Sequence, residues 1–247
     1  MSEVDFARIT AATILIPIAV AIWQRKSLNE PLRVFFWYRV FALLFNIVQH
    51  LFFWFANKYY EDIKDYLDWW GIQDTSFLSI LFYINDFIFI GWFYYLLLRY
   101  NRYGNYIKWL STILLIIVLI NYLFIEGYQI FGKFNPTAVA IFVFGVAFFY
   151  LWHLYKSHLV LPILKNPYFW MSFGLIIPHL IGFFLYATGD LIHKENYSFF
   201  VSLSTIKNGF LIIAQILFAI GFWNARYAKY ISLGGNEDTL AQNKTED

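Results

Sequence analysis

The sequence predicts an all-α polytopic membrane protein with seven transmembrane helices, its N-terminus outside and its C-terminus in the cytoplasm. Composition is the first reason, because 60% of the 247 residues are hydrophobic and only 14% are charged. Length is the second, since seven helices of about 20 residues leave roughly a dozen residues for each loop and each end. The distribution of Lys and Arg is the third. The same composition excludes a soluble globular enzyme, a disordered protein and a nucleic-acid binder.

Seven apolar stretches define the expected helices: residues 7–24, 34–56, 76–98, 108–126, 137–155, 168–188 and 197–223. Each is long enough to cross the hydrocarbon layer, and each is flanked by charge, Pro or Gly. The first stretch is not a cleavable signal, because Glu3 and Asp5 are acidic where a signal peptide is basic. His153 and Pro178 interrupt the fifth and sixth stretches. A six-span alternative would place both ends of the chain on one side.

Basic residues orient these helices. Eleven of the 18 Lys and Arg lie in the first, third and fifth connections and the C-terminal tail: Arg25, Lys26, Arg33, Arg99, Arg102, Lys108, Lys156, Lys165, Arg226, Lys229 and Lys244. Five lie on the other side: Arg8, Lys58, Lys64, Lys133 and Lys194. The remaining two, Arg39 and Lys207, fall inside the spans. Because cytoplasmic loops carry the excess of positive charge, the N-terminus is expected outside and the C-terminus inside.

Two segments lie outside the spans. The longest connection, 57–75, is acidic, and its apolar residues recur at helical spacing before Gly71. This pattern predicts either an amphipathic helix on the outer membrane surface or an extension of the second span. Residues 232–247 have little apolar content and predict a disordered cytoplasmic tail, which leaves 1–231 as the transmembrane domain.

Polar side chains within the spans are the strongest functional signal, because ionisable groups are costly inside a bilayer. Four expected helices each carry one polar stripe. These are Arg39, Asn46, Gln49 and His50 in 34–56; Ser79, Tyr83 and Asp86 in 76–98; Ser172, His179 and Tyr186 in 168–188; and Ser204, Lys207, Asn208 and Gln215 in 197–223. Residues at these spacings share a helix face. The four stripes are therefore expected to face the interior of the bundle.

The predicted site centres on Asp86 and Lys207. Each lies ten residues from the outer end of its span, which at 1.5 Å per residue places both roughly 15 Å deep. We expect an ion pair between them at the floor of an outward-facing polar pocket. Its other expected members are Asn85, Asn208, Asn46, Gln49, His50 and His179. The alternative is a structural polar clasp that sets the helix register and binds nothing.

Three specific chemistries are weaker alternatives. A lysine in the seventh span resembles the retinal site of microbial rhodopsins, but the position four residues before Lys207 is Leu203 rather than an acid. A zinc or iron site would need convergence of three histidines with a carboxylate, namely His50, His179 and His193 with Asp190 or Asp86. Acyl or glycosyl transfer would need paired acids such as Asp190 and Glu195. No cofactor or metal is predicted, and no constellation assigns an enzymatic activity.

Short motifs along the chain resemble a group of small, uncharacterised seven-helix membrane proteins of Bacteroidota-type bacteria. The motifs are Ile14-Leu15-Ile16-Pro17, the stretch from Lys165 to Trp170 with Gly174, Ile206-Lys207-Asn208 and the segment from Ala219 to Trp223. The resemblance implies a bacterial inner membrane and an association with membrane signalling systems. It supplies neither an activity nor site residues.

The function expected from these features is a membrane sensor, receptor-like module or signalling accessory. Its pocket would bias helix packing, and its short basic loops would pass the change to a cytoplasmic or membrane partner, because the chain holds no kinase-sized domain. A small transporter or channel that uses the same stripe is the first alternative. A structural membrane subunit is the second. The bilayer is the other expected partner, and no nucleic acid is expected.

Overall fold

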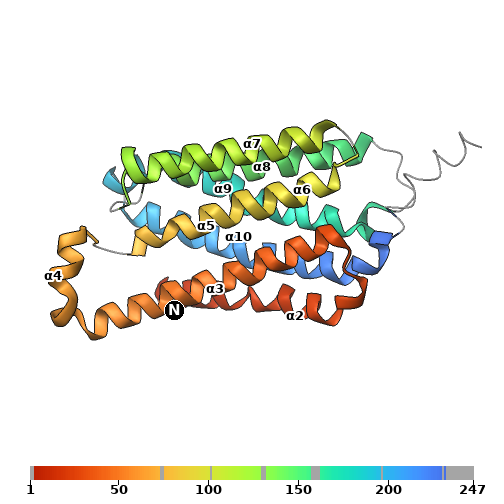
Figure 1. Cartoon of the computed structure of the whole chain (residues 1–247). Helices are drawn as coiled ribbons and strands as arrows, with labels where there is room; N and C mark the ends of the chain where they lie inside the picture. The colour runs from red at the N-terminus through yellow and green to blue at the C-terminus, as the bar shows by residue number, and fades with distance from the viewer. Residues whose placement is uncertain are drawn as a thin grey trace, which may run out of the picture.

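The computed structural model describes residues 3–72, 75–100, 102–128, 132–156, 162–195, 197–229 and 231. This part of the chain is all-helical, and its long helices run side by side as an elongated bundle (Figure 1). The main helices are α1 (Glu3–Ala12), α2 (Leu15–Trp23), α3 (Glu30–Lys58), α4 (Tyr60–Trp70), α5 (Ser79–Asn85), α6 (Gly91–Leu97), α7 (Arg102–Ile120), α8 (Phe134–Lys156), α9 (Pro167–Glu195) and α10 (Tyr197–Trp223). Short 3-10 or π segments join or extend them: η1 (Arg25–Ser27), η2 (Thr75–Leu78), η3 (Asp86–Ile90), η4 (Asn121–Ile125), η5 (Ile163–Lys165) and η6 (Asn224–Tyr227).

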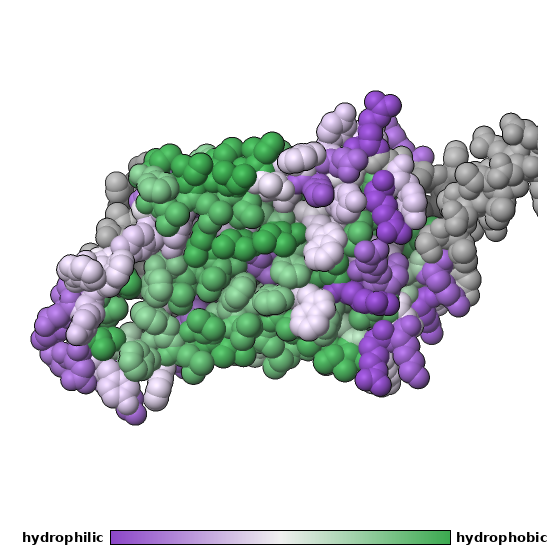
Figure 2. Space-filling model, viewed as in Figure 1, coloured by the Kyte–Doolittle hydropathy of each residue, from purple (hydrophilic) through white to green (hydrophobic). Residues whose placement is uncertain are grey.

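Six helices in the described residues are long and apolar enough to cross a membrane. They are Glu30–Lys58, Thr75–Leu97, Arg102–Ile125, Phe134–Lys156, Pro167–Thr188 and Val201–Tyr227. They correspond to the second to seventh expected spans, and neither His153 nor Pro178 breaks its helix. Figure 2 shows a broad apolar band between two hydrophilic ends. A soluble protein would not expose so many large apolar side chains along its helices, so the chain is membrane-embedded.

The first expected span differs from the other six, because its apolar helix Arg8–Trp23 is shorter and broken. A turn at Thr13 and Ile14 separates α1 from α2. Pro17 explains the break, since it has no N–H to bond to the carbonyl of Thr13 and its ring crowds that oxygen. The amide of Ile16 donates to this carbonyl instead, at 3.0 Å, and the Thr13 hydroxyl bonds the carbonyl of Thr10 at 2.6 Å.

The helix α4 settles the two expectations for residues 57–75. The helix α3 ends at Lys58, and α4 is a separate helix that lies across one end of the bundle (Figure 1). Gly71 caps it in the left-handed conformation, with φ of 65°, and Glu61 pairs with Lys64 on its surface at 2.8 Å. An extension of the second span is therefore wrong. The expected tail, residues 232–247, lies outside the described residues.

The closest helix pair is α9 with α10, and small residues allow the approach. A Cβ added to Gly174 would lie 2.6 Å from the ring of Phe218, and one added to Gly221 would lie 2.8 Å from Met171. Such small-residue contacts replace the hydrophobic driving force that is absent between helices in lipid. The hairpin of α9 and α10 then packs against α8 on one side and against α1 and α2 on the other.

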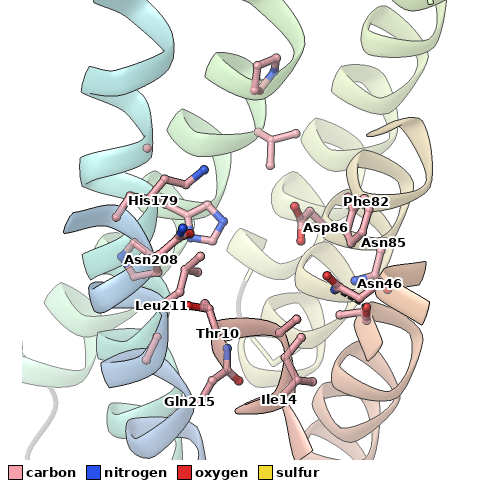
Figure 3. Close-up of a pocket in the computed structure, with 18 of the residues that line it drawn as sticks. Thr10, Ile14, Asn46, Phe82, Asn85, Asp86, His179, Asn208, Leu211 and Gln215 are labelled. Carbon is pink, nitrogen blue, oxygen red and sulfur yellow. Dashed lines mark hydrogen bonds between the residues drawn. The ribbon is translucent and has the colours of Figure 1, made fainter. Parts of the chain in front are cut away.

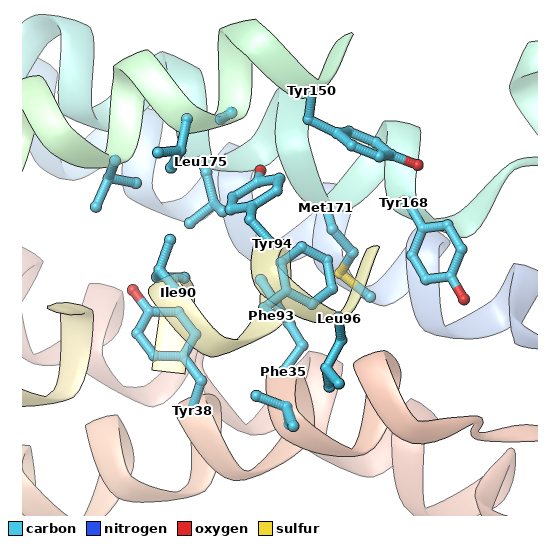
Figure 4. Close-up of a cluster of buried hydrophobic side chains, with 14 of the residues drawn as sticks. Phe35, Tyr38, Ile90, Phe93, Tyr94, Leu96, Tyr150, Tyr168, Met171 and Leu175 are labelled. Atoms are coloured by element: carbon cyan, nitrogen blue, oxygen red, sulfur yellow. The ribbon is translucent and has the colours of Figure 1, made fainter. Parts of the chain in front are cut away.

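An aromatic core fills one half of the bundle. The side chains of Phe35, Phe93 and Tyr94 are fully buried, and Figure 4 shows them gathered between α3, α6 and α9. Phe35 also contacts Phe218 and Phe222 of α10, with ring centroids 5.0 and 6.1 Å apart. This half of the bundle is therefore tightly filled, whereas the other half contains a cavity.

Candidate functional site

A cavity of about 730 Å³ lies between α1, α3, α5, η3, α8, α9 and α10. This volume is in the range of small-molecule sites in proteins. All eight residues of the predicted polar cluster line it: Asn46, Gln49, His50, Asn85, Asp86, His179, Lys207 and Asn208. The structure therefore brings these eight residues around one cavity, whereas Ser79, Ser172 and Ser204 of the expected stripes are not among its lining residues.

Asp86 lies on one wall of the cavity, beside α3. The hydroxyl of Tyr38 donates a hydrogen bond to Oδ1 of Asp86 at 2.9 Å. The ring of Tyr38 also faces the guanidinium of Arg39, whose Cζ lies 5.1 Å from the ring centroid. Tyr38 thus stands between a carboxylate and a guanidinium, and the two charges offset each other across one aromatic side chain.

The backbone at Asp86 is unusual, because the helix Thr75–Leu97 changes there to the π-helical segment η3. The amide of Gly91 is shared between the carbonyls of Phe87 and Ile88. The Ser111 hydroxyl of α7 also donates to the carbonyl of Phe87. Single π turns of this kind are frequent at functional sites, and Asp86 is the first residue of this one.

Arg39 forms the floor of the cavity together with Gln215. Nη2 of Arg39 donates to Oε1 of Gln215 at 3.0 Å, and its guanidinium lies 5.2 Å from the ring of Phe218. Arg39 is 6% exposed and Gln215 is 3% exposed, and Nε of Arg39 has no hydrogen-bond partner in the part of the chain that the structure describes. Below this floor the aromatic core around Phe35 closes the bundle.

Lys207 lies on the opposite wall, formed by α9 and α10. Its ammonium donates to the hydroxyl of Tyr186 and lies 4.5 Å from the centroid of that ring. His179 and Asn208 lie on the same side of the cavity, across the open space from Asp86 (Figure 3). Nδ1 of His179 lies 2.7 Å from the carbonyl oxygen of Leu175.

The expected Asp86–Lys207 ion pair is not formed. Among the described residues the salt bridges within 4.0 Å are Lys64–Glu61 and Arg99–Glu30. Asp86 and Lys207 each bond to a tyrosine of the neighbouring helix on their own wall, Tyr38 and Tyr186. The cavity separates the two walls, so equal depth in the membrane did not bring the two charges together.

More exposed polar residues surround the mouth of the cavity. His50 and Arg8 are exposed, and Nδ1 of His50 lies 2.8 Å from the carbonyl oxygen of Asn46. Gln49 donates to the hydroxyl of Thr75 at 2.9 Å, which ties α3 to η2 at this end. Exposure falls from His50 at the mouth to Arg39 at the floor. The cavity is therefore a pocket with one closed end.

Two groups of lining residues are absent from the predicted set. Tyr38 precedes Asn46 by eight residues, so it lies on the same helix face, and its spacing could have identified it. Thr10 lies on α1 and Ile14 in the turn that follows it, and a largely apolar segment gives no polar stripe that would indicate them. The first helix contributes to the site although its sequence is largely apolar.

The expected alternatives involving metals and paired acids are not supported by the described side chains. No group of three or more His, Asp or Glu that could hold a metal is found among them. His50 and His179 both line the cavity, where His50 is exposed and His179 is partly buried. The side chains of Asp190, His193 and Glu195 lie outside the described residues.

Similarity to known proteins adds nothing to this geometry. No family model matches the chain, and no curated protein or solved structure is similar to it. Any functional assignment therefore depends on the cavity and its residues alone.

Proposed function

We propose that this protein is a receptor-like membrane sensor that binds a small ligand in the cavity between α3, α9 and α10. One observation carries the proposal: polar side chains from four spans and the broken first helix line a single pocket of about 730 Å³ with one closed end. The Asp86 carboxylate and the Lys207 ammonium do not pair with each other, and this separation supports an open ligand site rather than a closed clasp.

The closed floor favours a receptor over an open pathway. A channel needs a polar path from one side of the membrane to the other. Here polar residues continue from His50 down to Arg39 and Gln215, and buried aromatic residues follow, including Phe35 and Phe218. A ligand in this pocket would contact α3, α9 and α10 at once, and it could shift their packing.

The topology in this proposal is seven spans, with the short helix Arg8–Trp23 as the first, the N-terminus outside and the C-terminus in the cytoplasm. The excess of Lys and Arg in the connections 24–33, 99–108 and 156–165 supports this orientation. It places the mouth of the pocket on the outer side. A bacterial inner membrane and a cytoplasmic or membrane signalling partner complete the proposal.

A small transporter is the second candidate, and two helix irregularities favour it. The break between α1 and α2 and the π turn at Asp86 both border the cavity. Transporters commonly bind substrate at discontinuous helices near the middle of the bilayer. The closed floor would then be one state of an alternating cycle.

A cellular experiment tests the receptor proposal against both alternatives. The transcripts of a deletion strain would be compared with those of a strain that carries Asp86→Asn with Lys207→Met at wild-type membrane abundance. We expect the double variant to reproduce the changes seen in the deletion strain. The matched control is Glu61→Gln with Lys64→Met, which removes an exposed ion pair of α4 and should leave transcripts unchanged.

Three outcomes would contradict the proposal. A deletion that changes no transcripts excludes a sensor. A double variant that is present in the membrane and gives wild-type transcripts shows that the polar cluster is a structural clasp. If vesicles take up a substrate, and the double variant abolishes this uptake without changing transcripts, the result would favour the transporter.

A further inference from the structure

The charges that line the cavity are not balanced. Among the described residues that line it, Arg8, Arg39 and Lys207 are cationic and Asp86 alone is anionic. Asp86 and Arg39 offset each other through Tyr38, which bonds the carboxylate and faces the guanidinium. The positive charge of Lys207 therefore has no anionic counterpart among the described side chains of the cavity wall.

The surroundings of Lys207 offer donors but no anion. Its ammonium bonds the Tyr186 hydroxyl, and no Asp or Glu carboxylate lies within 4.0 Å of it among the described residues. His179 and Asn208 are on the same wall, and the exposed Arg8 lines the mouth. An ammonium at membrane depth is costly unless it meets an anion. A ligand that brings one would relieve this cost.

Apolar side chains extend from this region toward the floor. Leu211, Leu175 and Ile14 line the cavity, and Phe218 lies beside Arg39 at the floor. The distance along α10 from Lys207 to Phe218 is about 16 Å at the usual helical rise. That depth suits an extended alkyl chain of about ten carbons when its headgroup is at Lys207.

We propose that the ligand is a single-chain anionic amphiphile, with a carboxylate or phosphate headgroup at Lys207 and an apolar chain directed toward Phe218. This inference rests on the proposed ligand-binding function. A cationic headgroup is disfavoured because the described side chains that line the cavity include three cations and one anion. A neutral amphiphile would leave Lys207 without an anion.

The test uses the full-length protein in nanodiscs of phosphatidylcholine, which add no net anion. Four probes share one chain length: decanoate, decyl phosphate, decanol and decyltrimethylammonium. We expect saturable binding and a raised melting temperature with decanoate and decyl phosphate. The other two probes should bind at least tenfold more weakly. A further arm with phosphatidylglycerol in the nanodisc distinguishes the sources, since competition with decanoate would identify a bilayer lipid as the natural anion.

Substitutions locate the headgroup. Lys207→Met should weaken decanoate binding at least tenfold, and Lys207→Arg should restore most of it because it retains the charge. Asp86→Asn should bind decanoate as tightly as the wild type or more tightly, because it removes an anion from the cavity lining. Lys108→Met is the matched control, since Lys108 is exposed on α7 and does not line the cavity.

Each remaining outcome overturns the inference in a distinct way. Equal binding of decanol or decyltrimethylammonium shows that the charge of Lys207 does not select the ligand, while the ligand-binding function itself stands. Unchanged decanoate binding by folded Lys207→Met moves the headgroup elsewhere. If no probe binds saturably, the amphiphile class is wrong, and the transcript comparison then decides whether the receptor proposal survives.

Discussion

The Tyr38 hydroxyl bonds the Asp86 carboxylate at 2.9 Å, and this contact joins α3 to the π-helical segment η3 inside the membrane-spanning bundle. The same tyrosine faces Arg39, which bonds Gln215 of α10. One chain of contacts thus links three helices around the floor of the cavity. A substitution at any of these residues should therefore alter the packing of the other two helices.

Tyr38→Phe should destabilise the protein by about 1–2 kcal/mol, because a hydrogen bond to a buried carboxylate is stronger than one to a neutral acceptor. Tyr94→Phe is the matched control: Tyr94 is buried and its hydroxyl bonds the neutral Oγ of Ser172 at 2.9 Å. Its loss should cost about 0.5–1 kcal/mol. Reversible unfolding in mixed detergent micelles measures both. If Tyr38→Phe costs no more stability than Tyr94→Phe, the charge of the Asp86 carboxylate does not strengthen its hydrogen bond.

Much of this architecture is predictable from the sequence, because hydropathy alone decides which segments can be in lipid. The second to seventh expected spans all coincide with long helices. The polar stripes also predict the cavity lining, since side chains such as Asn46 and His179 cannot face lipid cheaply and must turn inward.

Local backbone events and the choice of partners are harder to predict. Pro17 indicates a break only when its crowding of the Thr13 carbonyl is considered, and the π turn at Asp86 has no proline or glycine pattern that announces it. Counting residues places Asp86 and Lys207 at the same depth, but in the structure they lie on opposite walls of the cavity. Axial position follows from counting residues, whereas distance across the bundle depends on how every helix packs.

Gln215→Leu should destabilise the protein by about 2–3 kcal/mol. The substitution removes the acceptor of Arg39 Nη2 and leaves a buried guanidinium whose Nε already has no partner. Gln49→Leu provides the comparison, because Gln49 bonds Thr75 nearer the mouth, where water can replace the bond. That variant should cost less than about 1 kcal/mol. Equal losses in micelle unfolding would show that the floor is hydrated.

Gly91→Ala should disrupt the contact between α6 and α7. A Cβ at position 91 would lie 2.3 Å from Oγ and 2.7 Å from Cβ of Ser111, too close for either helix to stay in place. We expect a loss of about 1–3 kcal/mol, typical of overpacking. Gly145→Ala is the control, since a Cβ there meets no atom within 4 Å, and it should be neutral or slightly stabilising.

A double variant tests the cause of the Gly91→Ala effect. Ser111→Gly removes both atoms that the new Cβ would meet, at the expense of its own hydrogen bond to Phe87. The loss in the double variant should therefore be smaller than the sum of the two single losses. Additive losses would mean that the Gly91→Ala damage arises from something other than the clash.

Cysteine accessibility tests the proposed orientation, and the chain is well suited to it because it contains no cysteine. His50→Cys places a thiol at the exposed mouth of the cavity, and Ser27→Cys places one in η1 at the opposite end of α3. With the mouth outside, a small membrane-impermeant thiol reagent should label His50→Cys in intact cells. It should label Ser27→Cys only after the membrane is permeabilised.

The wild-type chain is the blank, and Gln215→Cys at the buried floor should react slowly from either side. The reverse pattern, with Ser27→Cys labelled in intact cells, would place the cavity mouth in the cytoplasm and exclude a sensor of external ligands.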